Sequence, residues 1–118
     1  FNGIIDFGDM VYSYRAAEPG ICMAYVALGK GEPYKAMANI LKGYHSKFPL
    51  KNIELEAITY ISFIRICISV TMAAWRSKLF PSNKYLLISQ EKAWNYLRKI
   101  RHEDLELFSK KIVDYARS

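Results

Sequence analysis

The sequence has little cysteine, and the spacing of the two that it has excludes the common cysteine-based sites. Cys22 and Cys67 stand far apart, each within an apolar stretch. Without a Cys-x-x-Cys pair they predict no metal site. We expect both thiols to be buried, where a thiol behaves as a small hydrophobe. Reduced thiols are typical of a reducing compartment, so we also expect a cytoplasmic protein.

Acidic residues are scarce as well. Eleven Asp and Glu stand against 17 Lys and Arg in 118 residues, a net charge of +6. Such an excess is compatible with a partner that carries phosphate: a nucleic acid, a membrane surface or a nucleotide. The charges are dispersed along the chain, which favours an ordinary solvated surface. With 52% hydrophobic and 24% charged residues, the composition is that of one packed body and excludes a disordered tail.

The apolar periodicity predicts five helices, over residues 18–28, 33–46, 53–77, 89–100 and 103–116, with Ser89 as the N-cap of the fourth. We therefore expect a mainly α fold with one short strand at its N-terminal edge. Apart from the third helix, the residues expected to face the core are Ile21, Cys22, Tyr25, Leu28, Met37, Ile40, Leu41, Tyr44, Ala93, Trp94, Leu97, Ile100, Leu105, Phe108, Ile112 and Tyr115.

The third predicted helix is long and weakly amphipathic. Between Ala57 and Trp75 only Arg65 carries a charge, and about 20 apolar residues suffice to span a bilayer. An Arg in the middle of a span costs at least ~2.5 kcal/mol on insertion scales. We therefore predict a central buried helix and no membrane span, with a carboxylate or carbonyl partner for Arg65.

The first residues predict a strand that ends in a carboxylate. Ile4-Ile5 is short and apolar, and Asp6-Phe7-Gly8-Asp9 follows it as a turn. Asn2-Gly3 favours a type I′ hairpin turn, but a hairpin needs a strand before it. We therefore expect the chain to be part of a larger protein.

An Asp-Phe-Gly turn after an apolar strand resembles the metal-binding turn of protein-kinase-like enzymes. The longer run Ile4–Asp9 resembles the aminoglycoside phosphotransferase family of small-molecule kinases, and in particular its members that act on 5-hydroxylysine. Further matching segments cover residues 10–13, 21–25, 43–50, 65–74 and 81–89, so the resemblance extends to about Leu97.

The resemblance implies that residues 1–118 are the C-terminal helical portion of a kinase domain. The whole enzyme would transfer a phosphoryl group from GTP or ATP to a hydroxyl of an amino compound, with 5-hydroxylysine as the expected acceptor. Asp6 maps onto the Mg²⁺ ligand that faces the nucleotide. Asp9 matches a second family acid, which either helps to position the metal or catalytic loop or accepts backbone N–H bonds within the turn.

Three further residues have candidate roles through the same resemblance. Glu18 stands where the family has an acid that braces the catalytic loop, although Pro19-Gly20 replaces the apolar pair that follows it. Tyr44 and His45 are candidates for the acceptor-binding side. Their alternative role is the polar end of a surface helix.

The family's catalytic loop, His-Gly-Asp with a later Asn, does not occur: Ser46 follows His45, and Glu103 follows His102. The nucleotide-binding lobe is missing as well. We therefore expect no catalytic residue here, no activity from this chain alone, and self-association through apolar surface. The competing hypothesis is a basic helical module that binds nucleic acid or an acidic protein partner; we favour the kinase and expect no nucleic acid.

Overall fold

One long helix organises the fold. The computed structural model describes residue 3, residues 13–85 and residues 90–118. In these ranges the chain forms five α-helices and no strand: α1 (Ala17–Ala27), α2 (Pro33–Lys47), α3 (Asn52–Leu79), α5 (Glu91–Ile100) and α6 (Leu105–Arg117). The predicted mainly α class is confirmed. The predicted strand over residues 4–6 and the predicted N-cap Ser89 lie outside the described residues.

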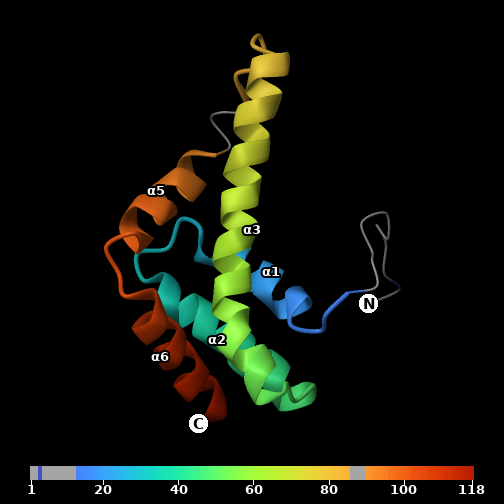
Figure 1. The fold of residues 1–118 in the computed structure, drawn as a ribbon, viewed down its shortest axis with the longest axis vertical. Coiled ribbons are helices and arrows are strands. Elements are labelled where there is room, and N and C mark those ends of the chain that lie inside the picture. The colour runs from blue at the N-terminus through green and yellow to red at the C-terminus, as the bar shows by residue number, and fades with distance from the viewer. Residues whose placement is uncertain (1–2, 4–12, 86–89) are drawn as a thin grey trace.

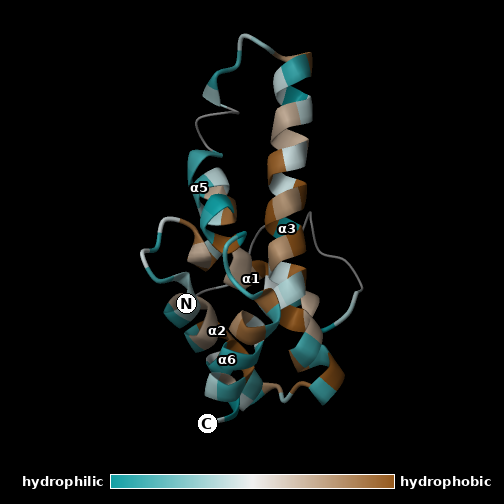
Figure 2. Cartoon of the chain, turned by 60° about the vertical axis from the view of Figure 1, so that its left-hand side comes forward, coloured by the Kyte–Doolittle hydropathy of each residue, from teal (hydrophilic) through white to brown (hydrophobic). Residues whose placement is uncertain are grey.

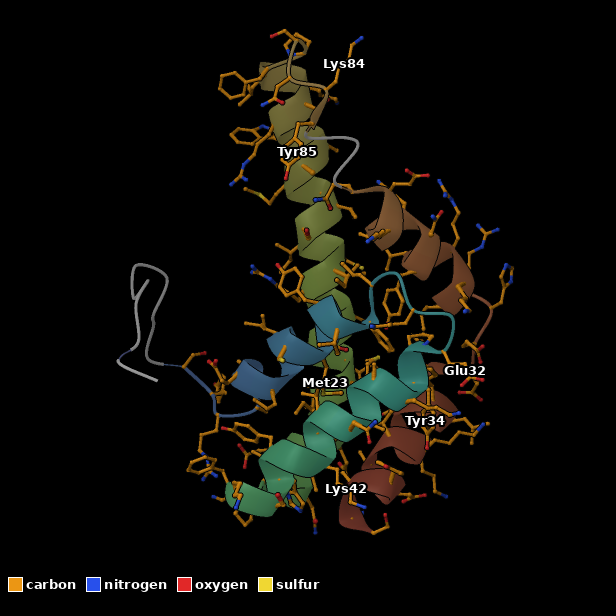
Figure 3. The ribbon with its side chains drawn as sticks, turned by 180° about the vertical axis from the view of Figure 1, so that it is seen from behind. Met23, Glu32, Tyr34, Lys42, Lys84 and Tyr85 are labelled. Atoms are coloured by element: carbon orange, nitrogen blue, oxygen red, sulfur yellow. The ribbon has the colours of Figure 1, made fainter. Side chains whose placement is uncertain are left out.

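Helix α3 runs the length of the molecule, and the other helices gather along it (Figure 1). Helix α1 packs against both α2 and α3, α6 packs mainly against α2, and α5 lies beside α3. Met23 of α1 lies at the centre of this arrangement (Figure 3) and is fully buried. Met37 and Leu41 of α2 and Ile66 of α3 are fully buried in the same cluster.

Helix α1 packs through a different face from the predicted one. Ile21 and Tyr25 are 37% and 46% exposed, while Gly20, Ala24 and Ala27 are buried. A Cβ atom on Gly20 would lie 2.9 Å from Cγ2 of Ile61. The small residues therefore let α1 approach α3 closely, and this close packing determines which face is buried in a helix that is apolar on all sides.

Helices α2 and α6 match their predicted spans and pack on each other. Pro33 occupies the first turn of α2, where its missing N–H costs nothing. The carboxylate of Asp104 accepts a hydrogen bond from the backbone N–H of Leu107 and caps α6 at 3.2 Å. The hydroxyl of Tyr115, 39% exposed rather than in the core, donates to Asn39 Oδ1 at 2.9 Å. A polar contact thus ties the end of α6 to the middle of α2.

Helix α3 is central but buried on one side only. Its buried side carries Leu55, Ile58, Phe63, Ile66 and Val70. Its outer side carries a row of apolar residues, which we call the outer stripe: Ile64, Ile68, Met72, Trp75 and Leu79, each 41–57% exposed. Figure 2 shows hydrophobic colour along this helix. By length and composition α3 could cross a membrane, and 39% of its most apolar window is buried; a core helix of a soluble protein passes the same test.

Three further predictions about packing are wrong. Cys22 and Cys67 are exposed thiols. Cys22 lies on the outer face of α1, because α1 buries its small residues instead. Cys67 lies next to Ile68 of the outer stripe, on the exposed side of α3. Trp94 is 44% exposed, and Tyr96 takes its place in the core. Arg65 has neither a carboxylate nor a carbonyl partner among the described residues: its Nε donates to the hydroxyl of Tyr25 at 3.2 Å.

Burial raises the pKa of Tyr96 well above its ordinary value near 10. The folded chain keeps the phenol protonated while the unfolded chain releases the proton, so stability must fall as the pH rises above about 10. We expect the free energy of unfolding to drop by about 1.4 kcal/mol per pH unit there. Denaturant titrations of Tyr96→Phe at pH 9–11 should lack this drop, and Tyr14→Phe, at an 86% exposed position, should retain it. Identical slopes in both variants would contradict the assignment to Tyr96.

Candidate functional site

The residues predicted to hold the metal, Asp6 and Asp9, lie outside the described residues. Within the described part of the chain, no group of three or more His, Cys, Asp or Glu side chains comes together as a metal site would require. Any such site must therefore include groups from elsewhere, and the Asp6 and Asp9 assignments stay predictions.

Glu18 lies exposed in the first turn of α1, where a carboxylate is favourable beside the free N–H groups. The two residues that depart from the family pattern, Pro19 and Gly20, are both buried. Pro19 and Gly20 therefore occupy buried positions, as the apolar pair of the family pattern would, but with smaller side chains. Among the described residues the side chain of Glu18 has no hydrogen-bond or ion-pair partner.

Tyr44 and His45 lie at the end of α2, and their side chains already have partners. The backbone N–H of Leu50 donates to Nδ1 of His45 at 3.0 Å. The neutral ring therefore carries its proton on Nε2, and only that N–H can reach a ligand. The ring of Tyr44 packs against Phe48, with centroids 5.7 Å apart. His45 can position an acceptor but is poorly placed to take a proton from it.

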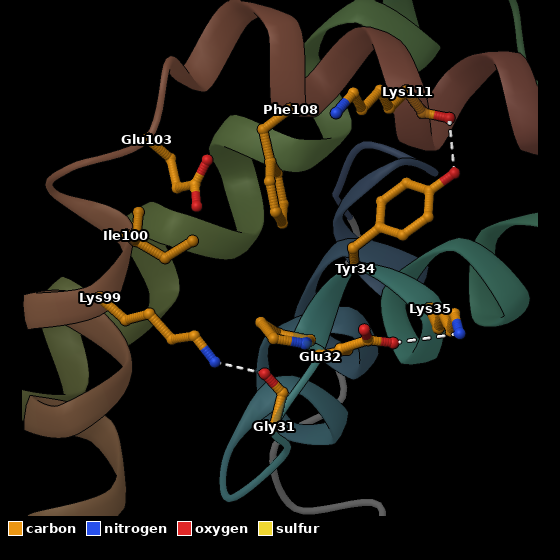
Figure 4. Close-up of a pocket in the computed structure, with 10 residues that line it drawn as sticks. Gly31, Glu32, Tyr34, Lys35, Lys99, Ile100, Glu103, Phe108 and Lys111 are labelled. Atoms are coloured by element: carbon orange, nitrogen blue, oxygen red, sulfur yellow. Dashed lines mark hydrogen bonds and ion pairs between the residues drawn. The ribbon is translucent and has the colours of Figure 1, made fainter.

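A cavity of about 650 Å³ lies between the start of α2, the end of α5 and α6 (Figure 4); we call it the α2–α6 cavity. Its volume is in the usual range for small-molecule sites. The residues that line it are Gly31, Glu32, Pro33, Tyr34, Lys35, Lys99, Ile100, Glu103, Phe108 and Lys111.

One wall of the α2–α6 cavity is apolar. Tyr34 and Phe108 meet edge to face with centroids 6.3 Å apart, and Ile100 lies beside them in Figure 4. The Tyr34 hydroxyl donates to the backbone carbonyl of Lys111 at 3.4 Å, a long hydrogen bond. This contact joins α2 to α6 across the cavity and holds the aromatic wall in place.

The rim of the α2–α6 cavity carries charges of both signs. Lys35 pairs with Glu32 at 3.1 Å, and because both side chains are about 70% exposed the pair adds little stability. Lys99 donates to the carbonyl of Gly31. In the described residues neither Glu103 nor the Lys111 ammonium has a side-chain partner. A cavity with an apolar wall, one open carboxylate and one open ammonium suits a small molecule that itself carries both charges.

Sequence reasoning did not find the α2–α6 cavity. Its residues come from α2, α5, α6 and the loops before α2 and α6, so the α2 side lies far in the sequence from the other two. Periodicity predicts which face of a helix is apolar but not which helix ends meet. The start of the helix predicted over residues 33–46, next to the cavity, is correct: α2 begins at Pro33. No pattern in the sequence links this helix start to Glu103 or Lys111.

No family model and no solved structure matches the chain. Among curated proteins it is similar to the hydroxylysine kinase of Mus musculus, with 35% identity, and to that of Bos taurus, with 32% identity; each match covers 84% of this chain. It is also 30% identical to the hydroxylysine kinase of Xenopus laevis, in a match that covers 92% of this chain. The chain spans only 27–29% of the length of these three relatives. The predicted resemblance to kinases that act on hydroxylysine is thereby confirmed: over most of its length this chain is similar to hydroxylysine kinases.

Proposed function

We propose that this chain is part of a small-molecule kinase of the aminoglycoside phosphotransferase type, which transfers a phosphoryl group from GTP or ATP to the hydroxyl of 5-hydroxylysine in the cytoplasm. The observation that carries the proposal is the similarity to hydroxylysine kinases over 84–92% of the chain. The chain lacks a His-Gly-Asp loop, so we propose that it is not active alone.

Asp6, with Asp9 as the second candidate, would hold Mg²⁺ in the whole enzyme. Carboxylate oxygen is the ligand that Mg²⁺ prefers, and Mg²⁺ sites in kinases combine one or two carboxylates with phosphate oxygens and water. A single acid at the end of the strand predicted from the sequence fits that requirement. When bound, the ion would neutralise charge on the transferred phosphoryl group.

The α2–α6 cavity is our candidate for the acceptor. 5-Hydroxylysine carries ammonium groups and a carboxylate on an aliphatic chain. Glu103 supports the proposal as a carboxylate available to an ammonium group, and Lys111 as an ammonium available to the carboxylate. The apolar wall formed by Ile100 and Phe108 suits the methylene groups. Tyr44 and His45 line none of the described cavities and remain weaker candidates.

The proposal is tested by single-turnover phosphoryl transfer with the full-length protein that contains this chain. Radiolabelled GTP and ATP are supplied separately with Mg²⁺ and 5-hydroxylysine, and lysine serves as the matched acceptor without a hydroxyl. We expect labelled product from 5-hydroxylysine only. Absence of product with both donors would overturn the proposal.

A second candidate function is a basic module that binds nucleic acid or an acidic partner. One observation favours it: two neighbouring cavities share Lys99, and around them gather Lys30, Lys35, Lys92 and Lys111. Such a cluster can neutralise several phosphates.

This second function predicts a steep salt dependence. Contact of these five lysines with duplex DNA would give a slope of about −4.5 in log K against log salt, at about −0.9 per phosphate. We expect instead a slope shallower than about −1, because the charges form no continuous stripe along one helix. Fluorescence anisotropy with a labelled duplex measures this slope at salt concentrations of about 50–200 mM, where such effects are large. A steep slope that becomes shallower in Lys99→Gln would favour the basic module.

A further inference from the structure

A second cavity, of about 550 Å³, lies along α3 on the side of the outer stripe; we call it the Arg65 cavity. Arg65, Ser69 and Arg76 of α3 line it, together with Tyr25 of α1 and Gln90 just before α5. Among the described residues that line it there is no Asp or Glu. It therefore differs from the α2–α6 cavity, whose rim carries both signs of charge.

Arg65 is held in place from one side only. Its Nε donates to the hydroxyl oxygen of Tyr25 at 3.2 Å, and its guanidinium carbon lies 5.8 Å from the centre of the same ring. No other described residue accepts a hydrogen bond from its two terminal nitrogens. A guanidinium fixed in this way presents two parallel N–H donors to a ligand at little further cost in side-chain entropy.

The other polar groups of the Arg65 cavity are also left as donors. The oxygen of Tyr25 accepts from Arg65, so its own O–H proton is free to donate. The hydroxyl of Ser69 donates to Oε1 of Gln90 at 3.2 Å, which leaves the amide nitrogen of Gln90 to donate. A cavity whose described lining offers donors and positive charge, and no carboxylate to balance them, is complementary to a group of acceptor oxygens with negative charge.

We propose that the Arg65 cavity binds the phosphate group of a small molecule. Arg65 offers paired N–H donors, through which Arg binds phosphate in two parallel hydrogen bonds, and Arg76 adds a second positive charge to the same cavity, which favours a doubly charged phosphate over a carboxylate. Ile68, Met72 and Ala73 give the cavity an apolar side, which favours an organic phosphate over the free ion. The proposal does not depend on the kinase activity.

The test is a binding titration with this chain labelled with ¹⁵N in arginine, followed at the Nε–H resonance of Arg65. The probes are inorganic phosphate, glycerol 3-phosphate and acetate, at constant ionic strength. We expect saturable shifts with both phosphates, tighter binding of glycerol 3-phosphate, and the weakest binding for acetate. Equal affinity for acetate and phosphate would contradict a phosphate site.

The variants separate a site from general attraction to a basic protein. Arg65→Gln should weaken phosphate binding by about 10- to 100-fold, as expected for hydrogen bonds to a charged group, with binding of the variant followed at the Arg76 resonance. Arg98→Gln removes the same charge from α5, where Arg98 donates to Asn95 and lines none of the described cavities, and should change affinity less than about twofold. Equal losses in both variants would overturn the proposal.

Two further variants keep the test decisive if Arg65→Gln does not fold. Arg65→Lys keeps the charge but loses the paired donors, and Tyr25→Phe keeps the ring but removes the hydroxyl that holds Arg65. Each should weaken phosphate binding by about 3- to 10-fold, the effect of one hydrogen bond. Unchanged affinity in both would overturn the proposal. Because no turnover is measured, a protein that fails to phosphorylate 5-hydroxylysine can still pass this test.

Discussion

Asp6→Asn should lower kcat for phosphoryl transfer to 5-hydroxylysine by about 10²- to 10³-fold in the full-length protein, the usual effect of removing one electrostatic group from an active site. Asn has the same shape as Asp but no negative charge, so it is a poor ligand for Mg²⁺. The measurement is single-turnover transfer at saturating nucleotide over a range of Mg²⁺ concentrations.

The matched control is Asp114→Asn, an equal change of charge at an exposed position of α6. It should retain kcat within about twofold, because exposed substitutions away from a site have small effects. A kcat for Asp6→Asn close to that of Asp114→Asn would show that Asp6 is not the metal ligand.

The same assay distinguishes the two roles considered for Asp9. If this carboxylate helps to hold the metal, Asp9→Asn should raise the Mg²⁺ concentration required for half-maximal rate. If it accepts backbone N–H bonds within the turn, Asp9→Asn should leave the Mg²⁺ requirement unchanged and lower the thermal stability.

Ile66→Ala should destabilise this chain by about 2–5 kcal/mol, the cost of emptying a fully buried isoleucine site. Ile66 has no exposed surface and belongs to the central cluster between α3 and its neighbours. Urea denaturation followed by circular dichroism gives the free energy of unfolding.

Ile64→Ala is the control on the same helix. It deletes the same atoms two residues away, where the side chain is 57% exposed, so its cost should be about 0.5 kcal/mol or less. Similar losses in both variants would mean that α3 is oriented differently. If the longer polypeptide covers the outer stripe, Ile64→Ala should cost more in the full-length protein than in this chain.

The sequence predicted the helices because their signals are local. Pro33 and Asp104 mark helix starts through their own backbone and side-chain chemistry, and the structure has both helices within two residues of the predicted bounds. Met37, Leu41 and Ile112 were expected in the core and are fully buried.

The face of α1 was not predictable in the same way. Nearly every residue of that helix is apolar, so periodicity could not distinguish the side of Ile21 from the side of Gly20. Shape decided it, because only small residues allow the close contact with Ile61. A rule based on hydrophobicity alone places the larger side chains inside.

The two candidate sites also differ in whether their signal is local in the sequence. Asp6 could be proposed from sequence because its turn is a contiguous motif. The Arg65 cavity could not, since Tyr25, Arg65 and Gln90 come from separate elements. Arg65 itself stood out as a lone charge in an apolar run. The carboxylate or carbonyl partner expected for it does not occur among the described residues, and the phenol oxygen of Tyr25 accepts its hydrogen bond instead.

The outer stripe of α3 also affects the thermodynamics of this chain. Its side chains are half hydrated in the folded state, so unfolding exposes less new apolar surface at these positions than at a buried site. Exposure of apolar surface is the source of the positive heat capacity of unfolding. The stripe therefore reduces that heat capacity, and it flattens the dependence of stability on temperature at both the cold and the hot end.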